Sequence, residues 1–239
     1  MSKFKKEDLL SLAPTKSINL SDNRIVQIRG LCVKEIKIML GDNSFNETMV
    51  EVIQSCVLTE IDISKLPTFD IELLYLAIWR LSKTSAIVPV SFRCTNEIDD
   101  NQCNHLVHTE INLDHVKLTD IPSTNIAING ALTIKMRFPT ILELDFFDIE
   151  KPSDVFDLVL RCIESVAMNG ETMVVGTDIE PSELAEVMDY IDETGMIKLI
   201  EFVTNLPTNK IDLAVKCDKC GHTEPMRLSG LNEIIGWVE

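Results

Sequence analysis

Hydrophobic residues in the first third of the chain recur at the spacing of α-helices. Over residues 47–57 they lie three or four positions apart, which predicts an amphipathic helix. Residues 69–81 are apolar on nearly every side, a pattern typical of a buried helix, and Thr68 or Asp70 is available to cap its first turn. Residues 31–40 mix helical and strand spacing, so their conformation stays open.

A period of two replaces the helical period in the middle of the chain. Residues 86–94 and 105–113 have β-rich alternation and are separated by a loop with a cysteine at each end, which predicts a β-hairpin. Residues 131–138 and 140–147 are expected to form a second pair of strands, joined closely at Pro139.

Helical spacing returns in the third quarter of the chain. We expect a helix that is capped by Ser153 and ends near Gly170. Pro181 is expected to open a second helix that Gly195 closes, and residues 196–205 to form a third.

The tail of the chain returns to strands. Residues 211–217 and a second short strand ending at Leu228 flank the turn CDKCGH, and a final helix starts at about Gly230. The expected fold class is therefore α+β, in which zinc-knuckle hairpins that form a split zinc ribbon are combined with a helical acidic region.

We expect this chain to have three regions. Residues 1–120 form an N-terminal αβ region with the buried helix and the first cysteine hairpin. Residues 121–205 hold the second strand pair and the acidic helices. Residues 206–239 hold the CxxC hairpin and a helix, and are expected to pack back on the first hairpin.

The charge of the chain says more about its partners than its overall composition does. The 239 residues are 45% hydrophobic and 25% charged, as in an ordinary globular protein. The net charge of −16 argues against unaided binding along a phosphate backbone. Residues 143–201 hold sixteen acidic and only three basic residues. They form either a set of solvated helix faces or an acidic docking surface for a basic partner.

No segment is predicted to cross a membrane or to direct secretion. The uncharged stretch 121–134 is too short and too polar to span a bilayer. The start, MSKFKKEDLLSLAP, has no long apolar run or small-residue cleavage site. We therefore expect a reducing cytosol. There, seven cysteines with scattered spacing serve as thiols or metal ligands in preference to a disulfide framework.

Four cysteines have the pattern of a split zinc site. Cys217 and Cys220 are separated by two residues between predicted strands, and Gly221 lets the backbone turn so that amides point at the thiolates. A closed structural site needs four ligands, and Cys94 and Cys103 lie at the two ends of the loop in the earlier hairpin. Two such hairpins facing one another would hold one structural Zn²⁺ in a tetrahedron of four thiolates.

Other interpretations of these residues stay open. Sites of three cysteines and one histidine are also common, so His105, His108 and His222 are rival ligands; otherwise they are hydrogen-bonded surface histidines. The CxxC pair could be a redox pair, although such a pair normally opens a helix and here a β-type sequence follows. The other three cysteines are interpreted as small buried hydrophobes: Cys32, Cys56 and Cys162.

The sequence offers no catalytic constellation. It has no GxSxG elbow, no GxxxxGK[ST] loop, no HExxH and no GxGxxG after a strand. Four thiolates around a zinc would leave no coordination position for a water molecule, so the metal would be structural. We therefore expect that this protein is not an enzyme.

One block of the chain carries a family resemblance. LPTFDIE at residues 66–72 lies in the ordered series LCVKEIKIML, VIQSCVLTEIDISKLPTFDIELLYLAIWRL, FRC, CNHLVHTEINLD and CDKCG. In this order the chain resembles the baseplate hub family of T-even-type contractile-tailed bacteriophages. The resemblance covers residues 25–120 well and residues 211–239 more loosely.

The resemblance implies a viral tail-assembly protein. It would be either a hub subunit or an assembly factor that helps the central hub to form and need not remain in the virion. Its partners would be other baseplate hub proteins, with neither nucleic acid nor a membrane. Its location would be the host cytoplasm during assembly, or the virion tail baseplate. We favour the assembly factor, because a soluble acidic chain with a stable fold suits a transient partner.

Two hypotheses from other classes remain. A zinc-ribbon regulator that binds nucleic acid is the alternative function, supported by the zinc knuckles and opposed by the net charge. A cytosolic enzyme that uses its thiols in redox chemistry is the third.

Overall fold

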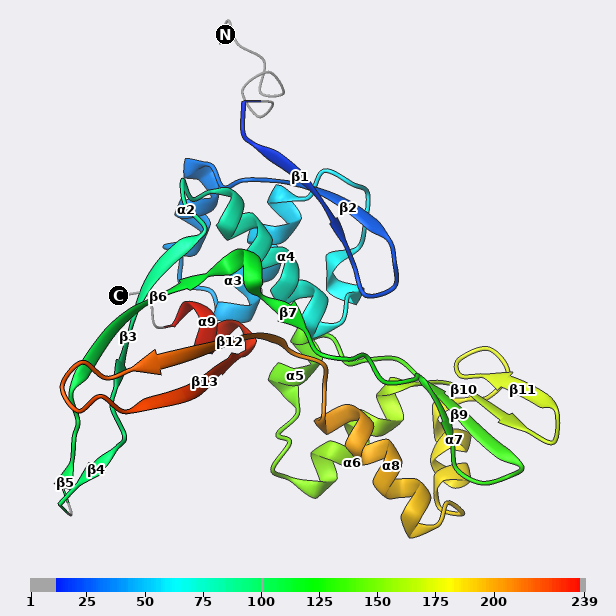
Figure 1. Ribbon diagram of the computed structural model, residues 1–239. Coiled ribbons are helices and arrows are strands. Elements are labelled where there is room, and N and C mark those ends of the chain that lie inside the picture. Colours follow the sequence, from blue (N-terminus) through cyan, green and yellow to red (C-terminus); the bar gives the residue numbers. More distant parts are fainter. Residues whose placement is uncertain (1–11, 100, 237–239) are drawn as a thin grey trace, which may run out of the picture.

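Two separate hydrophobic clusters organise the chain into two lobes (Figure 1). The computed structural model describes residues 12–99 and 101–236. The buried residues of the first cluster come mainly from 18–113 and 211–234, and those of the second come from 128–203. The expectation about secretion rests largely on the first eleven residues, which lie outside the described part of the chain.

A buried helix lies at the centre of the first lobe. Helix α4 (Thr68–Leu81) confirms the helix predicted over 69–81, and α3 (Phe45–Cys56) confirms the one predicted over 47–57. Around α4 lie the antiparallel pair β1 (Thr15–Asn19) and β2 (Ile25–Arg29), helix α3 and the C-terminal helix α9 (Gly230–Ile235) (Figure 1). Helix α2 (Val33–Met39) contacts α3, and the 3-10 turn η1 (Ile63–Lys65) precedes α4.

The predicted cap of α4 is wrong. The residue at the N-cap is Pro67, and no side chain caps the helix. The hydroxyl of Thr68 instead donates to the carbonyl of Pro139, and the fully buried carboxylate of Asp70 accepts two hydrogen bonds from Ser21. Both side chains therefore hold distant segments against the start of α4, and the helix begins with the preset backbone of proline.

The first cysteine hairpin is confirmed. Strands β3 (Ile87–Arg93) and β6 (Leu106–Asn112) pair antiparallel over their whole length. Beyond the cysteines the hairpin continues as a short second ladder between β4 (Glu97–Ile98) and β5 (Asn101–Gln102). A 3-10 turn, η2 (Leu113–His115), follows β6.

The C-terminal elements return to the first lobe. The strands and the final helix predicted in the tail are confirmed as β12 (Asn209–Lys216), β13 (Thr223–Ser229) and α9 (Gly230–Ile235). These strands form an antiparallel sheet in the order β13-β12-β7, with β7 at Lys117–Leu118. Strand β12 contacts β6 and α9 contacts α4, so the two cysteine hairpins lie side by side (Figure 1).

The second lobe is a four-stranded antiparallel sheet with three helices. The strand order is β11-β10-β9-β8, and helices α6, α7 and α8 complete its core (Figure 1). Helix α6 contacts both α8 and α7. Its elements are β8 (Asn125–Ala127), β9 (Leu132–Met136), α6 (Pro152–Cys162), β10 (Ile163–Met168), β11 (Glu171–Val174), α7 (Pro181–Met188) and α8 (Glu193–Thr204).

Two predicted elements of this lobe are wrong in type. Residues 140–147, predicted as a strand, contain helix α5 (Ile141–Phe146), because Thr140 and Glu143 form a capping box. The helix predicted to continue to Gly170 ends at Cys162, and the following residues form β10, which pairs with both β9 and β11. The strand is thus placed by pairing partners that lie outside its own segment.

Two predicted helix signals have other roles. The N-cap of α6 is Lys151, followed by Pro152 at the first helical position, so Ser153 lies inside the helix. Gly195 lies in the first turn of α8, where its amide donates to the capping carboxylate of Asp192. The helix opened at Pro181 and the one predicted over 196–205 are confirmed as α7 and α8.

An aromatic stack joins the two lobes. The ring of Phe69 at the start of α4 meets Phe138 edge-on at 5.0 Å, and Phe138 stacks on Phe202 of α8 at 4.7 Å. A β-bridge between Pro67 and Thr140 lies beside them. No helix in the described part of the chain is long and apolar enough to cross a membrane.

Candidate metal centre

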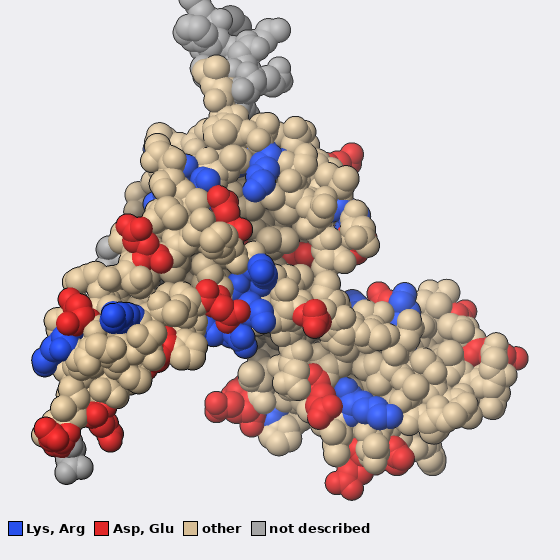
Figure 2. Space-filling view, viewed as in Figure 1, with Lys and Arg blue, Asp and Glu red and all other residues tan. Residues whose placement is uncertain are grey.

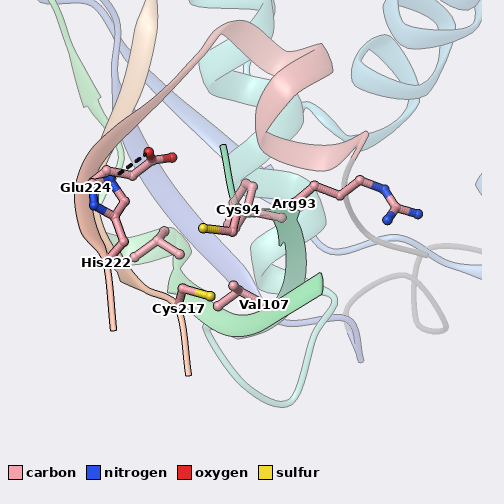
Figure 3. A pocket seen from close by; sticks show the side chains of 8 residues that line it. Arg93, Cys94, Val107, Cys217, His222 and Glu224 are labelled. Atoms are coloured by element: carbon pink, nitrogen blue, oxygen red, sulfur yellow. Dashed lines mark ion pairs between the residues drawn. The ribbon is translucent and has the colours of Figure 1, made fainter. Parts of the chain in front are cut away.

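The structure brings together all four cysteines of the proposed zinc site. Cys94 follows β3, Cys103 precedes β6, Cys217 follows β12 and Cys220 precedes β13. Their four Sγ atoms all lie within 4.8 Å of one another. The cluster forms where the ends of the two hairpins meet, and Figure 3 shows Cys94 and Cys217 facing the same space.

The sulfur separations fit a tetrahedral thiolate site. Cys94 Sγ lies 3.6 Å from Cys220 Sγ, and Cys103 Sγ lies 3.9 Å from Cys217 Sγ. A tetrahedron with Zn–S bonds of about 2.3 Å has edges of about 3.8 Å. Disulfide sulfurs would lie only about 2.05 Å apart. The donor set and its spacing therefore suit one ion of the Zn²⁺ type.

The two cysteine turns have the same backbone hydrogen bonds. The amide of Cys217 donates to the carbonyl of His222, and the amide of Gly221 donates back to the carbonyl of Cys217. In the first hairpin the amide of Cys94 donates to the carbonyl of His105, and the amide of Asn104 donates back to the carbonyl of Cys94. The two turns are thus related by the same local geometry, and each presents its thiols to the other.

A left-handed residue closes each turn. Gly221 has φ +74°, and Asn104 has φ +52°. This backbone conformation is open to glycine and is tolerated by asparagine, and each residue directly follows the second cysteine of its turn. Sequence reasoning identified Gly221 but missed Asn104. Asn104 could have been found from the match between Cys-Asn-His at 103–105 and Cys-Gly-His at 220–222, in which it takes the place of Gly221.

The surroundings of the thiols are mostly closed to solvent. Cys94, Cys103 and Cys217 are buried, and Cys220 is partly exposed. The cavity beside them measures about 10 Å³, room for about one water molecule. Its walls include the side chains of Val215 and of Val107, which is labelled in Figure 3. A metal held by four sulfurs there has no open position, which suits a structural ion.

The thiols differ in how easily they ionise. The backbone amide of His222 lowers the pKa of the Cys220 thiol to about 7. The backbone amide of Asn96 favours the thiolate of Cys94. Burial and the neighbouring thiols together have a larger effect and raise the pKa of the Cys94 thiol to about 12. A cation bound among the four sulfurs would favour the thiolate form of all four cysteines, because its positive charge attracts each of them.

The three rival histidines have partners outside the sulfur cluster. His105 Nε2 lies 2.9 Å from Asp218 Oδ1, and His222 Nε2 lies 3.5 Å from Glu224 Oε2. The Nδ1 atom of His108 lies 2.8 Å from the hydroxyl of Ser91. In the described part of the chain, the metal-type cluster consists of the four cysteines alone.

The other cysteines lie away from this cluster. Cys56 and Cys162 are fully buried, and burial raises the pKa of each thiol to about 12, so both are chemically quiet. Cys32 is only half-buried; it stands at the N-cap of α2, with Sγ 3.5 Å from Nη1 of Arg29.

Polar side chains at the base of the first turn were also missed. The Nδ2 atom of Asn96 lies 3.8 Å from Cys220 Sγ, and the hydroxyl of Thr95 donates to Glu224 at 2.9 Å. Lys219 Nζ lies 3.5 Å from the carbonyl oxygen of Cys103. Each contact crosses from one cysteine hairpin to the other, which no spacing within one segment could reveal.

Comparison with known proteins identifies the family. A family model described as T4 bacteriophage base plate protein matches residues 13–236. The baseplate hub assembly protein gp26 of Enterobacteria phage T4 is 26% identical over 212 residues, which cover 88% of this chain and 92% of that protein. No solved structure matches the chain. The family match includes the second lobe as well as the cysteine turns, so the resemblance to the baseplate hub family is confirmed and the chain belongs to the T4 bacteriophage base plate protein family.

Proposed function

We propose that this protein is a non-enzymatic assembly factor of the phage baseplate hub, and that it works through contacts with other hub proteins. The observation that carries the proposal is the likeness to a hub assembly protein over nearly the whole length of both chains. The protein would act in the host cytoplasm during assembly. Retention in the virion tail baseplate as a hub subunit is the competing possibility.

We further propose that a structural zinc ion, held by Cys94, Cys103, Cys217 and Cys220, fixes the scaffold. The support is the set of four converging thiols and the matched turns that present them. Such an ion contributes folding energy and leaves no coordination position for substrate. We also propose that the two cysteine hairpins form a split zinc ribbon, and that the chain is divided into the regions 1–120, 121–205 and 206–239.

The second lobe would supply long-range attraction to basic partners. Residues 143–201 carry a large excess of acidic over basic residues, and acidic side chains are spread over this lobe (Figure 2). Within it Phe146 is 81% exposed and Tyr190 is 91% exposed, so large apolar groups are available beside the charges. A surface of this kind raises association rates, most strongly at low salt.

The nucleic-acid alternative has less support. A protein that binds along a phosphate backbone neutralises it with Lys and Arg, whereas this chain has a net charge of −16. A salt-dependent shift of DNA by the purified protein would revive that alternative.

Two measurements test the proposed function. In the first, the full chain is co-expressed with each other hub protein of the same phage, one at a time, and we expect at least one of them to copurify. Failure of every pair would contradict the proposal. In the second, finished tails are examined by mass spectrometry: absence of this chain supports an assembly factor, and its presence at stoichiometric amount supports a hub subunit.

A further inference from the structure

A short hairpin projects from the sulfur cluster. Residues 97–102 are here called the finger. Its described residues, 97–99 and 101–102, include the β4–β5 ladder and point away from the body of the first lobe (Figure 1). Its described residues are exposed, including the apolar side chain of Ile98 at 42%. Its sequence, EIDDNQ, holds three acidic residues and no basic one, and acidic atoms gather at its end in Figure 2.

The cysteine turn does not need the finger. Without residues 97–102 the first turn would be Cys-Thr-Asn-Cys-Asn-His, equal in length to the second turn, Cys-Asp-Lys-Cys-Gly-His. The two turns already share their backbone hydrogen bonds and their left-handed closing residue. The finger is therefore a six-residue addition to a turn that is complete in the other hairpin.

The base of the finger is held firmly. The amide of Cys103 donates to the carbonyl of Asn96 at 2.7 Å, so the finger starts and ends at one point. Two residues before the finger, the hydroxyl of Thr95 donates a hydrogen bond to Glu224 of β13. A two-stranded hairpin is marginal by itself in water, so these anchors and the thiol cluster fix its direction.

The finger has the composition of a docking element. A β-branched apolar side chain stands between Glu97 and Asp99, and it covers no core of its own. On a partner, an apolar recess would take Ile98, and a rim of Lys or Arg would pair with the two carboxylates. Charge complementarity thus favours a basic protein surface over a second copy of this strongly acidic chain.

We propose that the finger docks Ile98 into a recess with a basic rim on another baseplate hub protein. This inference rests on the proposed function and adds the surface through which it acts. The four-cysteine cluster would then set the direction of the finger, and the second lobe would add only general attraction.

The test uses the full chain and the hub protein that copurifies with it. One variant deletes residues 97–102. A second carries Glu97→Lys with Asp99→Asn, which keeps a residue type that tolerates the left-handed backbone of position 99. A third is Ile98→Ala. The matched control, Glu60→Lys with Asp42→Asn, makes the same change in net charge at two exposed residues of the first lobe that lie outside the finger.

We expect the metal content and melting temperature of all variants to equal those of the wild type. Partner affinity should fall about tenfold or more in the deletion and in the Glu97/Asp99 variant, and measurably in Ile98→Ala, as for an interface anchor. The control should change affinity by less than about threefold, since a rim or remote charge acts mainly on association rate. Point variants keep the test valid if the deletion does not fold.

Three results would overturn this inference but leave the proposed function standing. If the wild type and the folded finger variants bind the hub protein with equal affinity, the finger is not the docking surface, and the proposed function is unaffected. An equal loss in the control would show that net charge alone acts. A change in self-association of this chain, seen by light scattering without loss of partner, would assign the finger to a contact between copies. If no hub protein binds the wild type, both proposals fail.

Discussion

Cys103 Sγ lies 3.9 Å from Cys217 Sγ, although the two residues are 114 positions apart in the chain. Between them lie strands β6, β7 and β12 of the first lobe and the entire second lobe. A metal at this point would close that long segment into a loop. In chain-entropy terms such a closure disfavours the unfolded state by about 4–5 kcal/mol.

Replacing Cys217 with Ser is therefore expected to reduce the free energy of unfolding by about 4–5 kcal/mol, because one lost ligand opens the clasp. Urea unfolding followed by circular dichroism measures this. Cys162→Ser is the matched control, since it also places a hydroxyl at a fully buried cysteine but lies outside the cluster. An equal loss in both variants would show that burial, and not metal, explains the effect.

The buried pair of Arg29 and Glu35 should make stability depend on acid pH. Burial opposes ionisation of Glu35, but hydrogen bonds from Arg29, Ser55 and the amide of Cys32 prevail and lower its pKa from 4.5 to about 2. The folded state thus binds this proton more weakly than the unfolded chain. The stabilisation is present above pH 4.5 and is lost as the pH falls through about 2.

Glu35→Gln is expected to lower the free energy of unfolding at neutral pH by about 3 kcal/mol. The difference between the variant and the wild type should shrink as the pH falls from 4.5 towards 2. Urea unfolding of both proteins over this pH range checks it. A difference that does not change with pH would contradict the assignment.

Asp70 should behave in the opposite way. Burial raises its pKa, and the two hydrogen bonds from Ser21 only partly offset this. The folded state therefore holds this proton more tightly, so the ionised carboxylate costs stability at neutral pH and the cost disappears as the pH falls through the raised pKa.

Asp70→Asn is expected to change the free energy of unfolding by less than about 1 kcal/mol at neutral pH, because the amide can keep both contacts with Ser21. Asp70→Ala should lose about 1–3 kcal/mol, because it leaves the amide and hydroxyl of Ser21 without their acceptor. Thermal or urea unfolding distinguishes the two. Similar losses in both variants would argue against this hydrogen-bond account.

Gly195 is expected to be required for close packing of α8 on the second-lobe sheet. A Cβ atom there would lie 2.6 Å from Ile128 Cγ2 and 2.8 Å from Ile191 Cγ2. Gly195→Ala should therefore destabilise the protein by about 1–3 kcal/mol. Gly130→Ala is the control, because no atom lies within 4 Å of its added methyl group, and it should stay within about 1 kcal/mol of the wild type. Equal unfolding curves for the two variants would remove the packing argument.

The sequence predicted those elements whose signals lie within one segment. The apolar surface of 69–81 and the alternation around Cys94 and Cys103 led to α4 and the first hairpin. Thr140 and Glu143 also carried a local capping signal, but the alternation of 140–147 obscured it. Local pattern and local chemistry can therefore point to different structures, and here capping determined the result.

Contacts between distant segments could not be predicted in the same way. The β10 segment has residues at helical spacing, and only its pairing with β9 and β11 makes it a strand. The stack of Phe138 on Phe202 and the crossing contacts around Asn96 likewise depend on how separate segments meet. The meeting of the four cysteines is the one contact between distant segments that the sequence predicted. A structural zinc site needs four ligands, and the sequence holds two matching pairs of cysteines.

Metal analysis of the purified full chain tests the central claim most directly. We predict about one zinc ion per chain, and none in the Cys217→Ser and Cys220→Ser variants, whose melting temperatures should fall together with the metal. A wild-type protein that is free of metal, and that melts at the same temperature with and without added zinc, would contradict the account.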